Sequence, residues 1–183
     1  KEPGFDDLAW PTGPAPMGFG SVGSLSFGTT ISSGIPTAYF RTTVNVEDLE
    51  NINYFVFKLL VDDGAVVWVN GQEAFRDGFS AGTNVTHDTL SEQSGDENTF
   101  DEFEVSASLF VEGANVIAIE MHNRSVGNND MGFEMSVDAV ERLVPANEDP
   151  VFEWTSIWES GELTEFGESI EVPAVTKVGR TYR

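Results

Sequence analysis

The chain has 183 residues, and its 31 acidic residues outnumber its 9 basic ones, which gives a formal net charge of −22 at pH 7. A surface of this charge repels phosphates and attracts cations, which argues against nucleic acid as a partner. Cysteine is absent and only two histidines are present, which excludes disulfides and thiolate metal sites and leaves little for zinc sites or histidine triads. No apolar run approaches the roughly 20 residues of a membrane-spanning helix, so we expect no membrane insertion.

The first 37 residues are rich in glycine and proline, a composition typical of irregular backbone with short extended pieces. Aromatic residues recur within this segment, at Phe5, Trp10, Phe19 and Phe27. We therefore expect the segment to pack against a core rather than to extend freely into solvent.

Strand-like patterns follow one another from residue 38 onward, and no stretch has a helical period. Alternating apolar positions, β-branched residues and aromatic residues mark these strands, and turn residues separate them. The stretches with this pattern are residues 38–46, 51–61, 65–69, 72–76, 100–110, 116–121 and 131–143. Short strands with frequent turns predict an all-β fold, an antiparallel β-sandwich or jelly roll.

Asn70 and Gly71 form the strongest local turn signal in the chain. Both residues tolerate the positive φ of a type I′ turn, which joins the strands of a two-residue β-hairpin. The sequence therefore predicts a hairpin between residues 65–69 and 72–76.

The sequence divides into a main domain, a linker and a tail. Residues 1–143 form the predicted β-sandwich, and residues 144–150 form a linker because two prolines bracket polar residues there. Residues 151–183 hold a few strand-like pieces, which are too short to bury a core alone. The tail either adds to the first sandwich or begins a second domain.

Four stretches occur in a recognisable order: GFDDLAWPTGPAPMGFG, then YFRTTVNVEDL, then VDDGAVVWVNGQEAFRDGF, and finally GANVIAIEMHNRSVGNNDMGFEMSV. Together they resemble the galactose-binding-like jelly-roll module of secreted bacterial proteins and secreted hydrolases. The resemblance covers about residues 4–140, and it implies an extracellular β-sandwich of the carbohydrate-binding-module type, often with structural calcium. The tail from residue 156 looks like the opening strands of a fibronectin-III-like domain.

Asp62 and Asp63 precede Gly64 and an apolar strand. One interpretation is a turn, in which aspartate caps its own backbone and Gly64 takes a positive φ. The other is part of a calcium site, because calcium takes six to eight oxygen ligands. This Asp-Asp-Gly motif also resembles PA14-like lectin domains, in some of which paired aspartates hold a calcium ion that binds sugar hydroxyls.

Asn128, Asn129 and Asp130 offer a second set of oxygen ligands, with a polar turn as the alternative interpretation. If strands 54–61 and 116–121 run in the same direction, this loop and the Asp-Asp pair lie at one end of the sandwich. We expect Asn129 and Asp130 to be metal ligands, with Asp130 favoured by the first resemblance, and Asn128 to bind ligand.

Asp6 and Asp7 are further candidates for a structural calcium site, and an Asx-turn is the alternative. Arg76, His122 and Trp68 are candidate ligand-binding residues. An arginine beside carboxylates usually forms a structural ion pair, and a lone histidine is usually structural. For Trp68 we favour the core over an outward position, where its ring would stack on a sugar.

The leading hypothesis is a non-catalytic, calcium-stabilised carbohydrate-binding module of a secreted or cell-surface multidomain protein. Its partners would be a polysaccharide or glycan and the other domains of the parent protein. The alternative is a structural or assembly domain of an extracellular adhesin or filament, in which tail strands pair with a neighbouring copy. We expect no enzymatic activity, because no nucleophile or metalloprotease motif is present.

Overall fold

Two β-sheets form the described part of the protein. The computed structural model describes residues 1–142 and the backbone of residues 179–182, so the predicted linker and most of the tail lie outside the described residues. The strands are β1 (Met17–Phe19), β2 (Thr29–Thr30), β3 (Thr37–Val46), β4 (Ile52–Asp62), β5 (Gly64–Val69), β6 (Gln72–Asp77), β7 (Asp101–Ser106), β8 (Gly113–His122), β9 (Met131–Glu141) and β10 (Gly179–Tyr182). The 3-10 turns η1 (Leu49–Asn51) and η2 (Ala107–Leu109) are the helical elements within this part of the chain.

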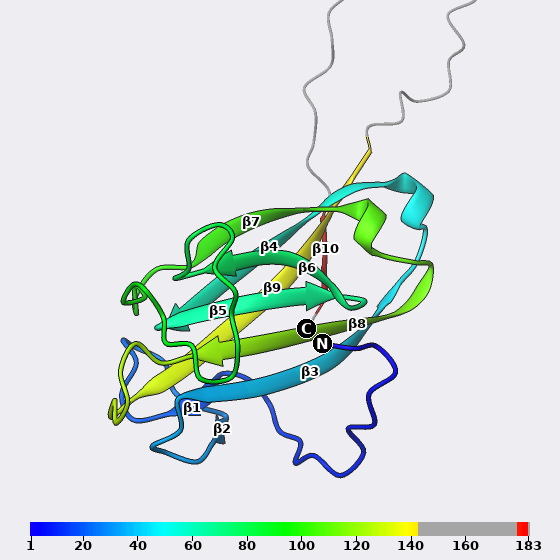
Figure 1. Cartoon of the computed structure of the whole chain (residues 1–183). Helices are drawn as coiled ribbons and strands as arrows, with labels where there is room; N and C mark the ends of the chain where they lie inside the picture. Colours follow the sequence, from blue (N-terminus) through cyan, green and yellow to red (C-terminus); the bar gives the residue numbers. More distant parts are fainter. Residues whose placement is uncertain (143–178, 183) are drawn as a thin grey trace, which may run out of the picture.

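One sheet has the strand order β2-β1-β9-β4-β7, and the other has the order β3-β8-β5-β6. The sheets lie face to face, so the protein is an all-β sandwich, as predicted (Figure 1). All strand pairs are antiparallel except β1 with β2, which are parallel. Within the described residues, no helix is long and apolar enough to cross a membrane.

The core lies between the two sheets and is built from alternate residues of each strand. Aromatic rings fill its centre: Phe55 stacks on Phe110 with centroids 3.8 Å apart, and Phe57 meets Phe75 edge to face at 5.4 Å. Fully burying one such side chain contributes about 1.5–3 kcal/mol to folding. The alternation of the sequence thus becomes the inward face of each sheet.

The predicted hairpin joins β5 to β6, and its turn residues Asn70 and Gly71 have φ angles of 50° and 82°. The Asn70 side chain also ties the turn to the rest of the sandwich. Its Nδ2 donates to Asn115 Oδ1 at 2.7 Å and to the backbone oxygen of Leu109 at 2.9 Å. Local turn chemistry and a long-range contact therefore support the same conformation.

The N-terminal segment packs partly into the core and partly over the outside of a sheet. Phe19 is buried in the core, whereas Phe5 and Trp10 stay exposed. Arg41 of β3 anchors the first residues, donating from Nη1 to the backbone oxygen of Glu2 at 2.8 Å and from Nε to Asp7 Oδ2 at 2.8 Å. The expectation of a packed segment is therefore confirmed, but part of it covers a sheet face instead of the core.

The last described strand, β10, pairs with β9 of the same chain. Gly179 lies opposite Val140 and Tyr182 lies opposite Val137, beyond the part of β9 that β1 covers. At these four positions the tail adds to the first sandwich, which was one of the two alternatives for it. Pairing of tail strands with a neighbouring copy stays a prediction.

Candidate functional site

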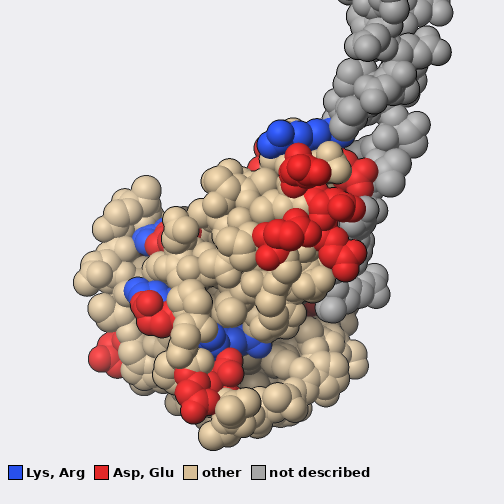
Figure 2. Space-filling view, turned by 90° about the vertical axis from the view of Figure 1, so that its right-hand side faces the viewer, with Lys and Arg blue, Asp and Glu red and all other residues tan. Residues whose placement is uncertain are grey.

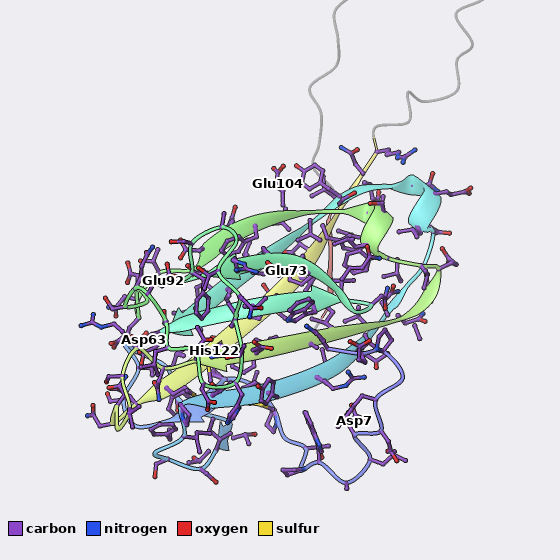
Figure 3. All side chains as sticks on the ribbon, viewed as in Figure 1. Asp7, Asp63, Glu73, Glu92, Glu104 and His122 are labelled. Atoms are coloured by element: carbon purple, nitrogen blue, oxygen red, sulfur yellow. The ribbon has the colours of Figure 1, made fainter. Side chains whose placement is uncertain are left out.

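The end of β4 and the end of β8 meet at one end of the sandwich. Asp62 of β4 pairs with Gly132 of β9, and Gly64 of β5 pairs with His122 of β8. This register brings the connection at residues 62–63 and the loop 123–130 together, as expected if β4 and β8 run in the same direction. Figure 3 shows Asp63 and His122 at this end, which we call the acidic end.

The chain passes from one sheet to the other at Asp63, since β4 and β5 belong to different sheets. The peptide bond between Asp62 and Asp63 is cis. Gly64 does not take a positive φ, so this part of the turn interpretation is wrong. Glycine is needed there for space, because a Cβ atom at residue 64 would lie 2.6 Å from Ser91 Oγ.

Asp62 and Asp63, the acidic pair, are buried with exposed fractions of 3% and 5%. Oδ2 of Asp63 accepts hydrogen bonds from the backbone N–H of Arg124 at 2.8 Å and from Asn128 Nδ2 at 3.2 Å. Oδ2 of Asp62 is buried and has no hydrogen-bond partner among the described residues. A buried carboxylate oxygen without a donor is costly, and either a proton or a cation on Asp62 would relieve this cost.

Four carboxyl groups from three connections act on one another at the acidic end. Burial, then the charge of Asp63 and the hydrogen bond between the two carboxyls, raise the pKa of Asp62 to about 7, with smaller contributions from Asp130 and Glu97. Burial, then Glu97 and Asp63, also raise the pKa of Asp130. A divalent cation among these groups would favour their ionised forms and so reverse both shifts.

The loop 123–130 contributes its predicted residues unequally. Asn128 contacts Asp63 directly, and Asp130 lies near enough to raise the pKa of Asp62. Asn129 is exposed, and its backbone N–H donates to Asn128 Oδ1 at 3.1 Å. The structure therefore brings Asn128 and Asp130 to the acidic pair and gives the Asn129 side chain no contact with it.

Two residues of the acidic end were not predicted. Asn123 is buried, and its Oδ1 accepts from Asn128 Nδ2 at 3.3 Å. Asn123 directly follows β8 and begins the loop that holds the predicted residues 128–130, so its position in the sequence could have indicated it. Glu97 accepts a hydrogen bond at Oε2 from the backbone N–H of Gly23 at 2.9 Å. Glu97 comes from a long polar loop without periodicity, so no sequence pattern pointed to it.

The acidic end has the donor chemistry of a calcium site and an incomplete set of carboxylates. Carboxylate and amide oxygens are the ligands that calcium prefers, and the unpartnered Oδ2 of Asp62 fits a bound cation. Within residues 1–142, however, no group of three Asp, Glu or His side chains is arranged to hold a metal ion by itself. A calcium ion at this end would therefore need amide oxygens, backbone carbonyls, water or a ligand for its remaining positions.

Asp6 and Asp7 do not belong to the acidic end. Oδ1 of Asp6 accepts from the backbone N–H of Leu8 at 3.1 Å, which is an Asx-turn. Asp7 forms an ion pair with Arg41 at 2.8 Å. Figure 3 shows Asp7 on the N-terminal segment, well away from Asp63. Asp6 thus forms the Asx-turn that was the alternative to metal binding, whereas the ion pair of Asp7 was not predicted; metal binding by either residue stays a prediction.

Arg76 and His122 are occupied by contacts within the chain. Arg76 forms a two-pronged ion pair with Glu73, at 2.6 Å from Nε and 2.8 Å from Nη2, and it donates to the backbone oxygen of Thr83 at 2.8 Å. His122 is fully buried, with Nδ1 2.8 Å from the backbone oxygen of Thr89 and Nε2 3.1 Å from Glu120 Oε1. Both side chains fix the loop after β6, and neither points a free donor toward the acidic pair.

Trp68 does not lie in the core. Val67 and Val69 point inward and belong to the core cluster, whereas Trp68 between them faces outward and is half-buried. The core position that we favoured for Trp68 is therefore wrong, because the alternation of β5 assigns odd positions to the interior. The outward position keeps Trp68 as a candidate for ligand contact.

No protein-family model matches the chain, and no curated protein matches its sequence. Among solved structures, it is similar to an α-L-rhamnosidase of Streptomyces avermitilis complexed with L-rhamnose (20% identity, TM-score 0.42), a β-glycosidase of Bacteroides vulgatus (16%, 0.39) and the PA14 domain of the antifreeze protein MpAFP (17%, 0.30). The matches cover 60%, 76% and 62% of this chain, which spans 9%, 21% and 47% of those chains. These values are too low to transfer a ligand, an activity or a site residue.

Proposed function

We propose that this chain is a non-catalytic carbohydrate-binding domain that binds its ligand through a calcium ion at the acidic pair. The observation that carries this proposal is the buried Oδ2 of Asp62, which has no hydrogen-bond partner beside a second buried carboxylate. A calcium ion would supply the missing charge and would remove the repulsion between Asp62 and Asp63. Asp130, Asn123 and Asn128 lie nearby and would be the candidates for further ligands, the Asn128 amide after a flip that turns its oxygen toward the ion.

The incomplete set of protein ligands for a calcium ion at the acidic pair supports a role in ligand binding. Calcium takes six to eight oxygens, and the carboxylates near the acidic pair do not complete that number by themselves. Adjacent hydroxyls of a sugar are oxygen ligands of suitable size for the remaining positions. Residues 124–127, which follow β8 beside Asp63, are exposed, so a sugar would reach the ion past this loop.

The charge of the molecule narrows the class of glycan. Acidic side chains predominate over basic ones on the face shown in Figure 2, in keeping with the net charge of −22. Such a surface repels uronates and sulfated sugars, so we propose a neutral polysaccharide. We also propose an extracellular location. A calcium site with few protein ligands binds weakly, and extracellular modules work at about 0.1–1 mM free calcium.

A second function, that of a calcium-stiffened structural domain, is favoured by the burial of the acidic pair. With exposed fractions of 3% and 5%, both carboxylates can enclose an ion without any contact to a glycan. In that case calcium would raise the stability of the sandwich, and the domain would act as a spacer or assembly unit of a surface protein.

The test measures calcium binding and glycan binding on the same protein. Isothermal titration with calcium should give a Kd of about 0.1–1 mM for the wild type and no binding for Asp63→Asn. Asp6→Asn serves as the matched control, because Asp6 lies outside the acidic end, and it should bind calcium like the wild type.

Retardation in gels containing soluble neutral polysaccharides, with calcium and with chelator, then separates the two functions. Calcium-dependent retardation that Asp63→Asn abolishes supports the carbohydrate-binding domain. A calcium-dependent rise in Tm without retardation by any polymer supports the structural domain. Failure of calcium to bind at all contradicts both.

A further inference from the structure

A groove lies on the outer face of the sheet β3-β8-β5-β6, apart from the acidic end, and its volume is about 260 Å³. We call it the outer groove. Its floor is Ala118 of β8, which pairs with Arg41 of β3 on one side and Trp68 of β5 on the other. Because neighbouring strands lie about 4.8 Å apart, the small alanine leaves a trough about 9.6 Å wide between the backbones of β3 and β5.

Aromatic rings line the outer groove on both sides. Phe5 and Trp10 come from the N-terminal segment and meet edge to face with centroids 5.5 Å apart. Tyr39 stands on β3 and Trp68 on β5. The exposed Lys1 lies over the Trp68 ring, with its Nζ 4.3 Å from the ring centroid, so a ligand reaches that face by displacing this side chain. Tyr39 stacks on His87 with centroids 5.9 Å apart, which fixes the orientation of its ring. Aromatic side chains on two sides of a trough suit a flat ligand with an apolar face.

Two polar groups give the outer groove hydrogen-bonding capacity. Glu120 lies on the floor beside Ala118, and its carboxylate is held by His122 Nε2, 3.1 Å from Oε1. The indole Nε1 of Trp68 is buried and has no hydrogen-bond partner among the described residues. An acceptor and an unpaired donor beside aromatic faces match a ligand that carries hydroxyl groups on the edge of an apolar ring.

The charges lining the outer groove disfavour charged ligands of either sign. Glu120 and the net charge of −22 oppose an anion. A cation would meet the ammonium of Lys1 on the Trp68 ring and the guanidinium of Arg41. A neutral ligand meets neither repulsion. It displaces only the flexible Lys1 side chain from the ring face.

We propose that the outer groove binds one ring of a neutral sugar, stacked on Trp68 and Tyr39 and hydrogen-bonded to Glu120. The volume is smaller than the roughly 300–1,000 Å³ of pockets that enclose drug-sized ligands, so the groove takes a single ring of a chain. It is independent of the calcium site. Trp68 is four residues along β5 from Gly64, a distance of about 13 Å. One polysaccharide that engages both sites gains affinity by multivalency.

The test is performed on the whole chain in chelator, which removes calcium from the acidic end, so that any binding there that depends on calcium is lost. Native gels containing galactomannan, xyloglucan, mixed-linkage glucan or soluble starch should retard the wild type with at least one polymer. Trp68→Ala and Tyr39→Ala should each weaken that binding about tenfold, as expected for the loss of one stacking contact. Trp68→Phe keeps an aromatic ring and loses the N–H donor, so it should retain part of the affinity.

Two controls separate the outer groove from other effects. Phe100 has the same exposed fraction as Tyr39, 41%, and lies outside the groove, so Phe100→Ala should bind like the wild type. Asp101→Asn, at an exposed aspartate outside both the groove and the acidic end, should also bind like the wild type in chelator. Thermal unfolding of each variant shows that it is folded, and Tyr39→Ala, at an exposed position, keeps the test valid if Trp68→Ala does not fold.

Three results would overturn the proposal. The first is that no polymer of the panel retards the wild type in chelator. The second is that folded Trp68→Ala and Tyr39→Ala bind as tightly as Phe100→Ala. The third is that tetramethylammonium quenches the tryptophan fluorescence of the wild type, and not of Tyr39→Ala, while the polymers have no effect. That result would make the groove a cation site.

Discussion

Asp62→Asn removes one charge from the acidic pair and keeps the size and shape of the side chain. In the calcium-free folded chain the pKa of Asp62 is about 7 instead of 3.8, first because the carboxyl is buried and second because Asp63 is charged beside it. The folded state therefore binds this proton more tightly than the unfolded state. The resulting stability is present in full below about pH 4 and is lost as the pH rises through about 7.

The magnitude follows from the difference between the two pKa values. It is about three, and each pKa unit corresponds to about 1.4 kcal/mol, so the wild type loses on the order of 4 kcal/mol between pH 4 and pH 8. Asp62→Asn has no such group, so in chelator at pH 8 it should be more stable than the wild type by up to this amount. A chain of this size gains about 2–4 °C in Tm per kcal/mol, so the expected gain is on the order of 10 °C.

Differential scanning calorimetry in chelator and in 5–10 mM calcium, at several pH values from 4 to 8, checks this reasoning. At pH 4 the wild type and Asp62→Asn should have nearly the same Tm in chelator. In calcium at pH 8 the wild type should recover the lost stability, and the variant should respond little. Asp101→Asn, at an exposed aspartate, should leave the pH dependence unchanged. A wild-type Tm that stays flat in chelator from pH 5 to pH 8, or a variant less stable at every pH, would refute the electrostatic argument.

Three further substitutions test the fold around the sites. Gly64→Ala should cost about 1–3 kcal/mol in urea unfolding, because its Cβ would lie 2.6 Å from the buried Ser91 Oγ. Asn115→Ala should cost about 2–3 kcal/mol in the same assay, because the fully buried amide oxygen accepts from Asn70 Nδ2 at 2.7 Å and from the backbone N–H of Val111 at 2.8 Å, and its loss leaves the Val111 N–H and one of the two Asn70 Nδ2 hydrogens without this partner. Arg41→Ala should speed chymotrypsin cleavage within residues 1–10, because Arg41 Nη1 and Nε hold that segment by bonds of 2.8 Å each. Unchanged unfolding midpoints for the first two, or an unchanged cleavage rate for the third, would contradict these assignments.

The sequence by itself determined what depends on local chemistry. Alternation within residues 38–46 and a long aromatic and β-branched run at residues 51–61 predicted strands, and the structure has β3 at Thr37–Val46 and β4 at Ile52–Asp62. Asn-Gly predicted the hairpin, because only a few residue types accept two consecutive positive φ angles. The absence of a helical period predicted an all-β sandwich. These features need no knowledge of which strands become neighbours.

Only the tertiary structure decided which residues meet. Asp62 and Asp130 are 68 positions apart, and the pairing of β4 with β9 and of β5 with β8 brings their loops together. Glu97 joins them from a loop without a pattern. The face that Trp68 occupies was equally undetermined, because a strand apolar at every position has no alternation to mark its inner side. Strand register is set by packing across the whole core, so the burial of Asp62 and the aromatic walls of the outer groove follow from the fold as a whole.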